Sequence, residues 1–371
     1  MSVMYEISPG EILKHSLLVR KTEFIHNDFF DEKSDIEKDN YGAGVSVLTI
    51  GDPHFRIDNL EEISVYISRI ENLVKNERPN FVVILGDLLH CHERVHTTVL
   101  NKAYSFINKL RKHVPVYILV GNHDYINNSQ FLTSNHWMNA MKEWSNVHVV
   151  DKGMIHDTQF GKFIFCPYVY PGKFKQAMEI IDKDWKTSRT IFCHQEFYGC
   201  KMGAMQSVDG DRWDEDDPFV ISGHIHDKQR LGTNIFYTGS SIQHAFGESH
   251  DKTITLCRFG NKLHFESIDL NLPRKKIMYM DMEQISDFTP NASSDKLRIT
   301  LAGSYEEFRV FRKSKKYKEL TKQNVKIVYR TRGVEVASKP VVRDNFYDIL
   351  DELVSDEKDD YMKQVYKQIL N

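Results

Sequence analysis

The fold is decided by the stretch Val116-Tyr117-Ile118-Leu119-Val120-Gly121-Asn122-His123-Asp124. Its five apolar residues, three of them β-branched, predict a strand that is buried on both faces. The chain then breaks at Gly121 and places an amide, an imidazole and a carboxylate at the carboxyl end of that strand. Open α/β sheets bind their ligands at this end, so the stretch predicts a buried sheet with a site at its edge.

The same layout, an apolar strand followed at once by polar side chains, occurs four more times. These strands are predicted over residues 45–50, 81–85, 190–193 and 219–222. Helices predicted over 60–75 and 97–113 join the first strands, and right-handed crossovers then give a parallel sheet. The polar side chains that follow the four strands are Asp52 and His54, then Asp87, then His194, then His224 and His226.

The chain as a whole predicts an α/β protein with four regions. Further helical patterns cover 137–144 and 172–184, short strands cover 147–150 and 163–166, residues 199–217 resemble a long loop, and 235–269 alternate as strands. The expected regions are an N-terminal extension (1–44) that forms a loosely docked arm, a main domain (45–272), a small basic α+β domain (273–337) with a helix over 305–320 and a strand over 325–329, and an acidic helical tail (338–371).

The composition is that of a folded intracellular protein. The 371 residues are 41% hydrophobic and 12% aromatic, which is enough to bury a large core. Five cysteines without a C-x-x-C pair indicate neither a disulfide framework nor a zinc finger. We expect no secretion signal and no membrane segment, because no apolar stretch approaches the length of a bilayer.

Charge is distributed unevenly along the chain. The net charge is −3, yet residues 258–343 contain 19 basic against 10 acidic residues. This excess predicts a C-terminal module that meets an anion. Five cations of this module are candidate contacts to a nucleic-acid backbone, and an equally good interpretation is a solvated helix face: Arg309, Arg312, Lys313, Lys315 and Lys316.

The side chains at the strand ends predict a two-metal site. They combine imidazole nitrogen with carboxylate and amide oxygen and include no thiolate, which suits manganese, iron or zinc. Seven ligands are too many for one ion. With Asp87 as the bridge, they divide into Asp52, His54 and His226 on one ion and Asn122, His194 and His224 on the other. Two divalent ions and two carboxylates leave about two positive charges, which favours a phosphate substrate and a bridging hydroxide as nucleophile.

These motifs resemble those of the calcineurin-like metallophosphoesterases. The matching segments are Asp52-x-His54, Gly86-Asp87, Gly121-Asn122-His123-Asp124, His194 and Gly223-His224-x-His226. Within that superfamily the chain most resembles the nuclease subunit of the SbcC–SbcD type of DNA repair complex, including those of large bacteriophages. Three features carry this likeness: His90, the run His194-Gln195-Glu196-Phe197-Tyr198-Gly199, and the basic domain followed by an acidic tail.

The resemblance implies a four-layer α/β/β/α sandwich and roles for three more residues. His123 would protonate or stabilise the leaving oxygen, His90 would orient the scissile phosphate, and Asp124 would hold His123 in its working tautomer. The implied cofactors are two divalent ions, Mn²⁺ first and Fe²⁺ or Zn²⁺ as alternatives. Phe55-Arg56 and the 44-residue extension depart from the family pattern. His92, Arg94 and His96 are candidates to face either the phosphate or a dimer partner.

The resulting hypothesis is a manganese-dependent DNA nuclease that acts as an exonuclease or endonuclease in repair or recombination. It would work as a homodimer with a coiled-coil ATPase of the SbcC type, in the cytoplasm or a nucleus, and a viral or phage source is compatible with it. One alternative is a stand-alone phosphoesterase that acts on nucleotides, RNA or phosphoproteins. Another is a scaffold that keeps the fold and mainly binds DNA or recruits a partner.

Overall fold

The protein was analysed as a computed structural model that describes residues 19–24, 44–92, 94–290, 295–331 and 354. It divides into two compact units. Among the described residues, the first comprises 19–24, 44–92, 94–277 and 295–298, and the second comprises 278–290, 299–331 and 354. The first unit contains the two large sheets and all five strand ends singled out above.

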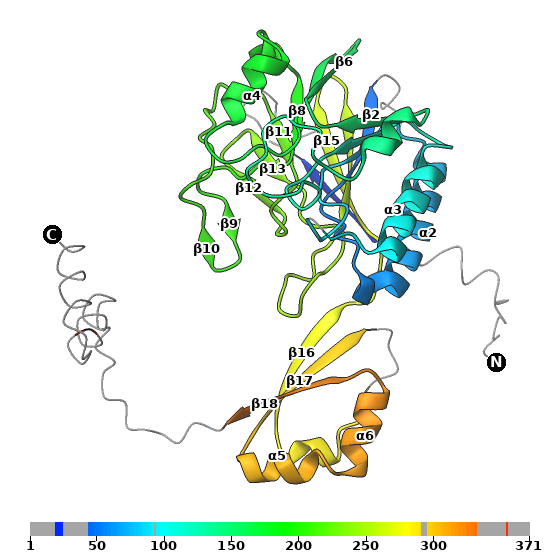
Figure 1. The fold of residues 1–371 in the computed structure, drawn as a ribbon, viewed down its shortest axis with the longest axis vertical. Helices are drawn as coiled ribbons and strands as arrows, with labels where there is room; N and C mark the ends of the chain where they lie inside the picture. Colours follow the sequence, from blue (N-terminus) through cyan, green and yellow to red (C-terminus); the bar gives the residue numbers. More distant parts are fainter. Residues whose placement is uncertain (1–18, 25–43, 93, 291–294, 332–353, 355–371) are drawn as a thin grey trace, which may run out of the picture. The chain divides into compact units, whose positions relative to one another are not determined.

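A seven-stranded mixed sheet carries the first three strand ends (Figure 1). Four parallel strands form one half, and an antiparallel strand from the far end of the domain pairs with the first of them. In spatial order the strands are β1 (Val19–Phe24), β15 (Leu263–Asp269), β14 (Ile254–Phe259), β2 (Val45–Ile50), β3 (Phe81–Ile84), β4 (Val116–Leu119) and β5 (Val147–Val150).

A six-stranded sheet carries the other two strand ends. Its central strands run parallel, so the carboxyl ends of β8 and β11 lie side by side. In spatial order the strands are β12 (Gln229–Leu231), β13 (Ile235–Tyr237), β11 (Val220–Ser222), β8 (Thr190–Cys193), β7 (Gly161–Phe165) and β6 (Met154–Thr158).

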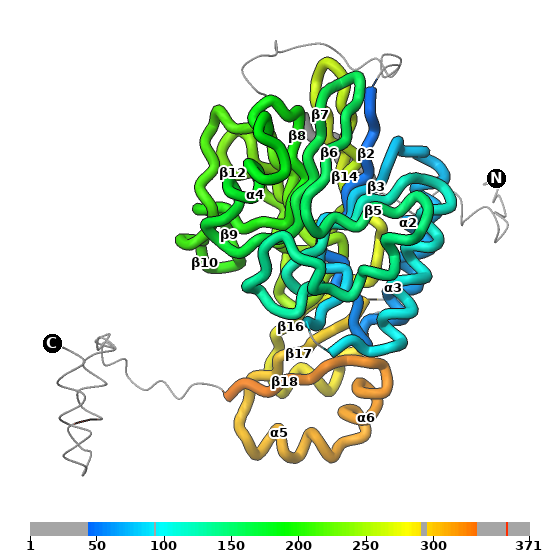
Figure 2. The backbone as a smooth tube through the Cα atoms, turned by 45° about the horizontal axis from the view of Figure 1, so that its top comes forward, coloured from blue at the N-terminus to red at the C-terminus, as the bar shows by residue number. Residues whose placement is uncertain are grey.

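The two sheets pack face to face between helices, which makes four layers (Figures 1 and 2). Alternation within each strand separates the layers: in β3, Phe81 and Val83 join the core between the sheets, whereas Val82 and Ile84 pack against the helices. The outer face of the large sheet is covered by α2 (Leu60–Glu77) and α3 (Thr97–Leu110), and that of the smaller sheet by α4 (Phe174–Ile181). The expected α/β/β/α sandwich is therefore observed.

Two expectations for the first unit were wrong in detail. The helix expected over 137–144 is a short 3₁₀ segment, η2 (Asn139–Glu143), and the loop over 199–217 contains a hairpin of β9 (Lys201–Met202) and β10 (Met205–Gln206). Shorter 3₁₀ turns are η1 (Ile57–Asn59) and η3 (Trp185–Thr187).

The N-terminal extension is not wholly a loose arm. Its residues 19–24 form β1, which pairs antiparallel with all of β15. This pairing satisfies the backbone groups that β15 would otherwise expose at the edge of the sheet. The other residues of the extension lie outside the described part of the chain.

A three-stranded sheet consists of β16 (Lys275–Asp281), β17 (Lys296–Gly303) and β18 (Lys326–Thr331), and all of it except residues 275–277 and 296–298 belongs to the second unit. A 3₁₀ turn, η4 (Gln284–Ser286), follows β16. The single helix expected over 305–320 is two helices, α5 (Tyr305–Phe311) and α6 (Lys315–Lys322). The second helix begins after its N-cap Ser314, whose hydroxyl accepts a hydrogen bond from the Tyr317 amide. The helical tail predicted over 338–371 lies outside the described residues except at 354.

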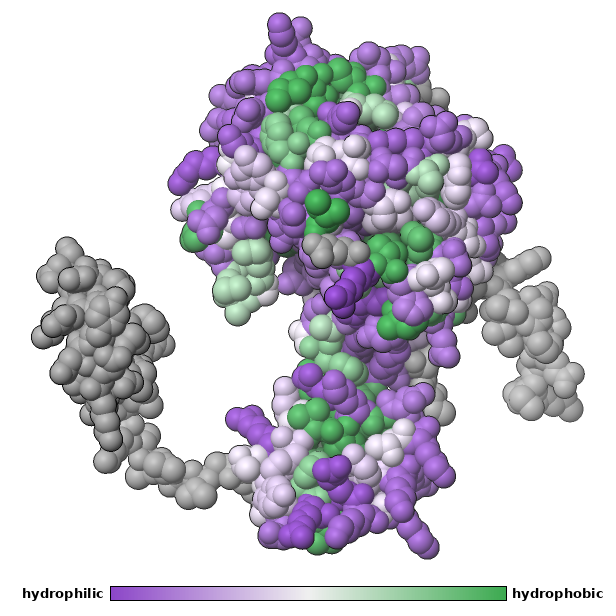
Figure 3. Space-filling view, viewed as in Figure 1, coloured by the Kyte–Doolittle hydropathy of each residue, from purple (hydrophilic) through white to green (hydrophobic). Residues whose placement is uncertain are grey.

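None of the helices in the described ranges combines the length and apolar character needed to cross a bilayer. On the face shown in Figure 3, hydrophilic residues predominate and apolar residues form separate patches.

Candidate metal centre

The five predicted strand ends converge on one buried cluster. Backbone hydrogen bonds join the loops that follow the strands: the His54 amide donates to the Asp87 carbonyl at 2.9 Å, and the Gly223 amide donates to the Cys193 carbonyl at 3.0 Å. The two sheets also meet here, because Nδ1 of His194, after β8, lies 2.7 Å from the Leu85 carbonyl, after β3. The site is thus formed where the carboxyl edges of both sheets come together.

Three of the predicted ligands form a tight group around Asn122. Oδ1 of Asn122 lies 2.9 Å from Nε2 of His194 and 3.0 Å from Nδ1 of His224, and the two imidazole nitrogens are 3.2 Å apart. His194 is fully buried, while His224 remains partly exposed at the rim.

A second group forms around His54. Its Nε2 lies 3.1 Å from Nε2 of His226, and its buried ring lies with the carboxylates of Asp52 and Asp87 in a cluster that could hold an ion. Asp52 is also fully buried and accepts a hydrogen bond from the His224 amide at 3.0 Å.

Asp87 stands between the two groups. Its Oδ1 lies 3.5 Å from Nε2 of His194, and its Oδ2 lies 3.5 Å from Nε2 of His54. Each carboxylate oxygen therefore faces a different group, as the bridge between two ions would require. The geometry brings all seven predicted ligands together, and their division between two ions stays a prediction.

The backbone around these residues is strained and crowded. Four residues, Asp52, His54, Asp87 and His224, have positive φ angles between 40° and 74°. Residues other than glycine rarely adopt such angles. A Cβ atom on Gly121 would lie 2.2 Å from Oδ1 of Asp87, so glycine is required for this approach. Strain concentrated at four of the seven candidate ligands indicates that the fold holds them for a purpose other than packing.

The donor set fits divalent cations. Nitrogen and oxygen atoms at 2.9–3.2 Å from one another need a proton or a metal ion between them. Burial keeps the pKa of His54 well below its usual value, which favours the neutral imidazole that metals bind. Burial also opposes charge on His194, yet the attraction of Asp87 raises the pKa of His194 to about 9, so a proton competes there with a metal.

His123 and His90 flank the His54 side of the cluster. The His123 ring stacks between His90 and His92, with centroid distances of 5.1 and 4.8 Å, and meets the His54 ring edge-on at 4.9 Å. Nδ1 of His90 lies 3.2 Å from Nδ1 of His54. The structure thus places His92 against His123, while His96 accepts a hydrogen bond as the N-cap of α3.

The expected role of Asp124 was wrong. Nδ1 of His123 faces the backbone carbonyl of His90 at 2.9 Å, so this carbonyl, and not Asp124, sets the tautomer. Asp124 instead accepts hydrogen bonds from Nε1 of Trp137 (3.0 Å) and from the amides of Gly121, Leu88 and Leu89 (3.1–3.3 Å). It therefore ties the loop after β3 to the loop after β4, because its short side chain turns toward these amides.

The model of the calcineurin-like phosphoesterase family matches residues 45–265 of this chain. The chain belongs to this family. A relative from Invertebrate iridescent virus 3, named "Putative phosphoesterase 078R", is 40% identical over 344 residues, which cover 90% of this chain and 98% of the relative. Another relative, from Invertebrate iridescent virus 6 and named "Putative phosphoesterase 244L", is 47% identical over 281 residues, which cover 72% of this chain and 98% of the relative.

Two solved structures are more distant. A dimetal phosphatase from Danio rerio aligns over 61% of this chain and 96% of its own, with 12% identity and a TM-score of 0.42. GAP50, the anchor in the inner membrane complex of Plasmodium, aligns over 62% and 85%, with 13% identity and a TM-score of 0.39.

Sequence reasoning missed three residues beside the candidate metal centre of this phosphoesterase. The His244 ring packs against His54 and His226 at 4.8 and 5.0 Å, and its Nε2 lies 2.9 Å from the Asp52 carbonyl. Glu248 pairs with Nδ1 of His226 at 3.9 Å and with the buried Lys252 at 3.3 Å. All three lie in the segment between β13 and β14, where no strand end marks them.

The five candidate DNA-contacting cations lie elsewhere, in the second unit. Arg309 is in α5, Arg312 and Lys313 follow it, and Lys315 and Lys316 begin α6. All are exposed except Lys316, which is half-buried. Both interpretations of this segment stay open.

Removing His54 should abolish metal binding on its side of the centre. Adding Mn²⁺ to chelator-treated protein should raise Tm by about 5 °C at a hundredfold excess over Kd, because only the folded state binds. His54→Ala should lose most of this increase, measured by calorimetry. Since the pKa of His194 is about 9, lowering the pH from 9 should weaken metal binding as the proton competes.

His113→Ala is the matched control, because His113 is partly exposed and lies beyond α3, at the opposite edge of the sheet. An equal Tm increase in wild type and His54→Ala would contradict the assignment of His54.

Glu248→Gln should weaken metal binding without unfolding the protein. Burial opposes its charge, yet His226 and Lys252 hold the pKa of Glu248 at about 2, so it is ionised beside the His226 ring. Losing a carboxylate that orients a ligating histidine typically costs 10- to 100-fold in metal affinity, and we expect this range in a Mn²⁺ titration followed by electron paramagnetic resonance. The exposed Glu143→Gln is the control. An unchanged affinity in Glu248→Gln would exclude this orienting role.

Proposed function

We propose that this phosphoesterase is a manganese-dependent nuclease that hydrolyses phosphodiester bonds of DNA. The observation that carries the proposal is the pair His90 and His123 beside the ligand His54. Neither belongs to the seven-ligand set, and both are partly exposed. They are therefore available to a substrate held there.

The chemistry of a phosphodiester explains why such a pair is useful. When bound, two divalent ions supply positive charge for the phosphate and bring the pKa of water near neutrality. Hydrolysis then breaks the bond between phosphorus and a sugar oxygen, and that oxygen needs a proton because alkoxides are poor leaving groups. His123 can donate this proton from Nε2 in its imidazolium form, in which Nδ1–H also donates to the His90 carbonyl. Burial lowers the pKa of His123, so the negative charge of Asp87 and of the bound phosphate must stabilise this form.

The choice of manganese follows from the donor set and from the likeness to repair nucleases. Three of the seven ligands are oxygen donors and none is a thiolate, which suits Mn²⁺ better than a structural zinc site. Fe²⁺ and Zn²⁺ fit the same atoms, so the metal titration must compare all three.

The decisive assay compares an end-labelled DNA duplex with a small chromogenic phosphodiester. Wild type should cut both with Mn²⁺ and neither with chelator. His123→Ala should slow DNA hydrolysis by about 10²–10⁴-fold, the usual contribution of a general acid, and should retain Mn²⁺ affinity. His90→Ala should also slow DNA hydrolysis. His113→Ala serves again as the control.

Cleavage of the small ester alone, at any metal concentration, would contradict the nuclease proposal. The stand-alone phosphoesterase acting on nucleotides, RNA or phosphoproteins would then replace it. A biological function that is unchanged in Asn122→Ala or His123→Ala would instead favour a scaffold.

We also propose that the chain works as a homodimer with a coiled-coil ATPase of the SbcC type. The support is the family likeness and the acidic segment 338–371, which lies outside the described residues except at 354. Light scattering should give about twice the chain mass of 43.4 kDa. ATP should stimulate cleavage when such an ATPase from the same genome is added. A monomer whose activity does not respond to the ATPase would contradict this proposal.

A further inference from the structure

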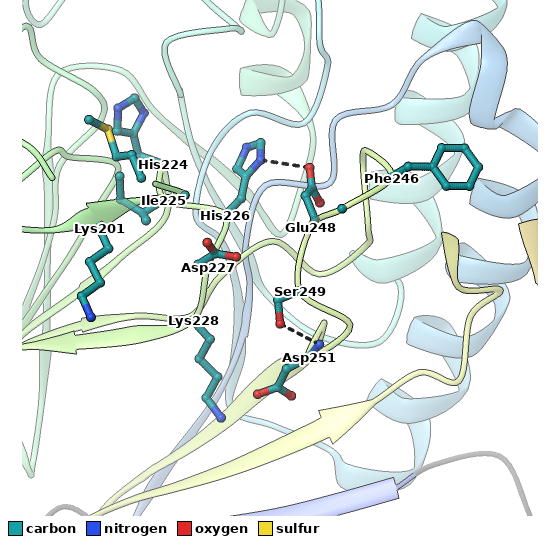
Figure 4. Close-up of a pocket in the computed structure, with 13 residues that line it drawn as sticks. Lys201, His224, Ile225, His226, Asp227, Lys228, Phe246, Glu248, Ser249 and Asp251 are labelled. Atoms are coloured by element: carbon teal, nitrogen blue, oxygen red, sulfur yellow. Dashed lines mark hydrogen bonds and ion pairs between the residues drawn. The ribbon is translucent and has the colours of Figure 1, made fainter. Parts of the chain in front are cut away.

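A cavity of about 790 Å³ adjoins the metal centre within the first unit. His224 and His226, one from each group of candidate ligands, form part of its wall. Figure 4 shows Lys201 on one side of it and Glu248 and Ser249 on the other. A substrate whose phosphate lies at the metals can therefore extend directly into this space.

The size and the lining of the cavity suit a nucleoside. Cavities of roughly 300–1,000 Å³ enclose small organic ligands of that size. Asp227 and Asp251 contribute carboxylates to the wall, which repel a phosphate but accept hydrogen bonds from hydroxyl and amino groups. The interior thus favours a sugar or base over a second phosphate.

Lys201 provides the cation for the next phosphate. The other lysine of the wall, Lys228, donates to the Ser267 hydroxyl at 2.7 Å. Lys201 is exposed, and Figure 4 draws no ion pair between its side chain and the other residues of the wall. A phosphate on the outer side of a bound nucleoside would meet this ammonium group.

The main chain of Lys201 is held in place. Oε1 of Gln229, in β12, accepts from the Lys201 amide at 2.8 Å, and Nε2 of Gln229 donates to the Lys201 carbonyl at 2.8 Å. This two-point contact fixes the base of the β9–β10 hairpin, which projects from the rest of the unit in Figure 1 and forms a pale-green tip in Figure 3. The main chain of Lys201, from which its side chain extends, therefore has a defined position.

We propose that this cavity is a flanking subsite: it binds the nucleoside next to the scissile phosphate of a polynucleotide, and Lys201 contacts the following phosphate. The inference rests on the proposed nuclease function and specifies where the polynucleotide lies beyond its scissile phosphate. A small phosphodiester without a nucleoside reaches the metals and leaves the subsite empty.

The test compares substrates that do and do not reach the subsite. Lys201→Gln should lower kcat/KM for a DNA oligonucleotide by about tenfold and reduce the salt dependence of log kcat/KM by about one unit of slope, because one phosphate contact is lost. Its kcat/KM for bis(p-nitrophenyl) phosphate should be unchanged. Ser249→Trp, which fills the cavity, should likewise lower kcat/KM for the oligonucleotide and leave kcat/KM for bis(p-nitrophenyl) phosphate unchanged.

Lys112→Gln is the control, because this exposed lysine follows α3 at the amino edge of the parallel strands, away from the site. Oligonucleotide kinetics and salt slopes within twofold of wild type in both Lys201→Gln and Ser249→Trp would overturn the subsite while leaving the nuclease intact. Wild type that cuts the small ester and no polynucleotide would overturn the proposed function itself, and the subsite with it.

Discussion

The carboxylate of Asp87 is the constraint on which the rest of the structure depends. A buried ion loses several kcal/mol of hydration, so it persists only where other groups stabilise its charge. Asp87 has the His123 amide at 2.9 Å and imidazoles of His54 and His194 on its two oxygens. Although burial opposes the charge, His194 keeps the pKa of Asp87 well below its usual value. Divalent ions would complete this stabilisation.

The architecture can be understood as the means of bringing ligands to this carboxylate. Loops after β2, β3 and β4 supply Asp52, Asp87 and Asn122 from one sheet, and those after β8 and β11 supply histidines from the other. The aromatic core between the sheets sets their separation, and positive φ angles turn the side chains inward. The partly exposed His90 and His123 lie beside His54, and a cavity lined by His224 and His226 adjoins the cluster.

The strands and the seven candidate ligands were predictable, because buried parallel strands are continuous apolar runs and each ended in ligand-type residues. Other features depend on contacts distant in sequence. β1 exists because β15 needs a partner, and the β9–β10 hairpin is fixed by Gln229. His244 and Glu248 lie in a loop with no periodic pattern, and the partners of Asp124 became clear only once the loops after β3 and β4 were seen together.

The most direct test of the two-metal account is anomalous X-ray scattering from crystals soaked in Mn²⁺. The account predicts two anomalous peaks, one beside each oxygen of Asp87, with Asn122, His194 and His224 around one and Asp52, His54 and His226 around the other. A single peak, or peaks that do not share Asp87, would contradict it.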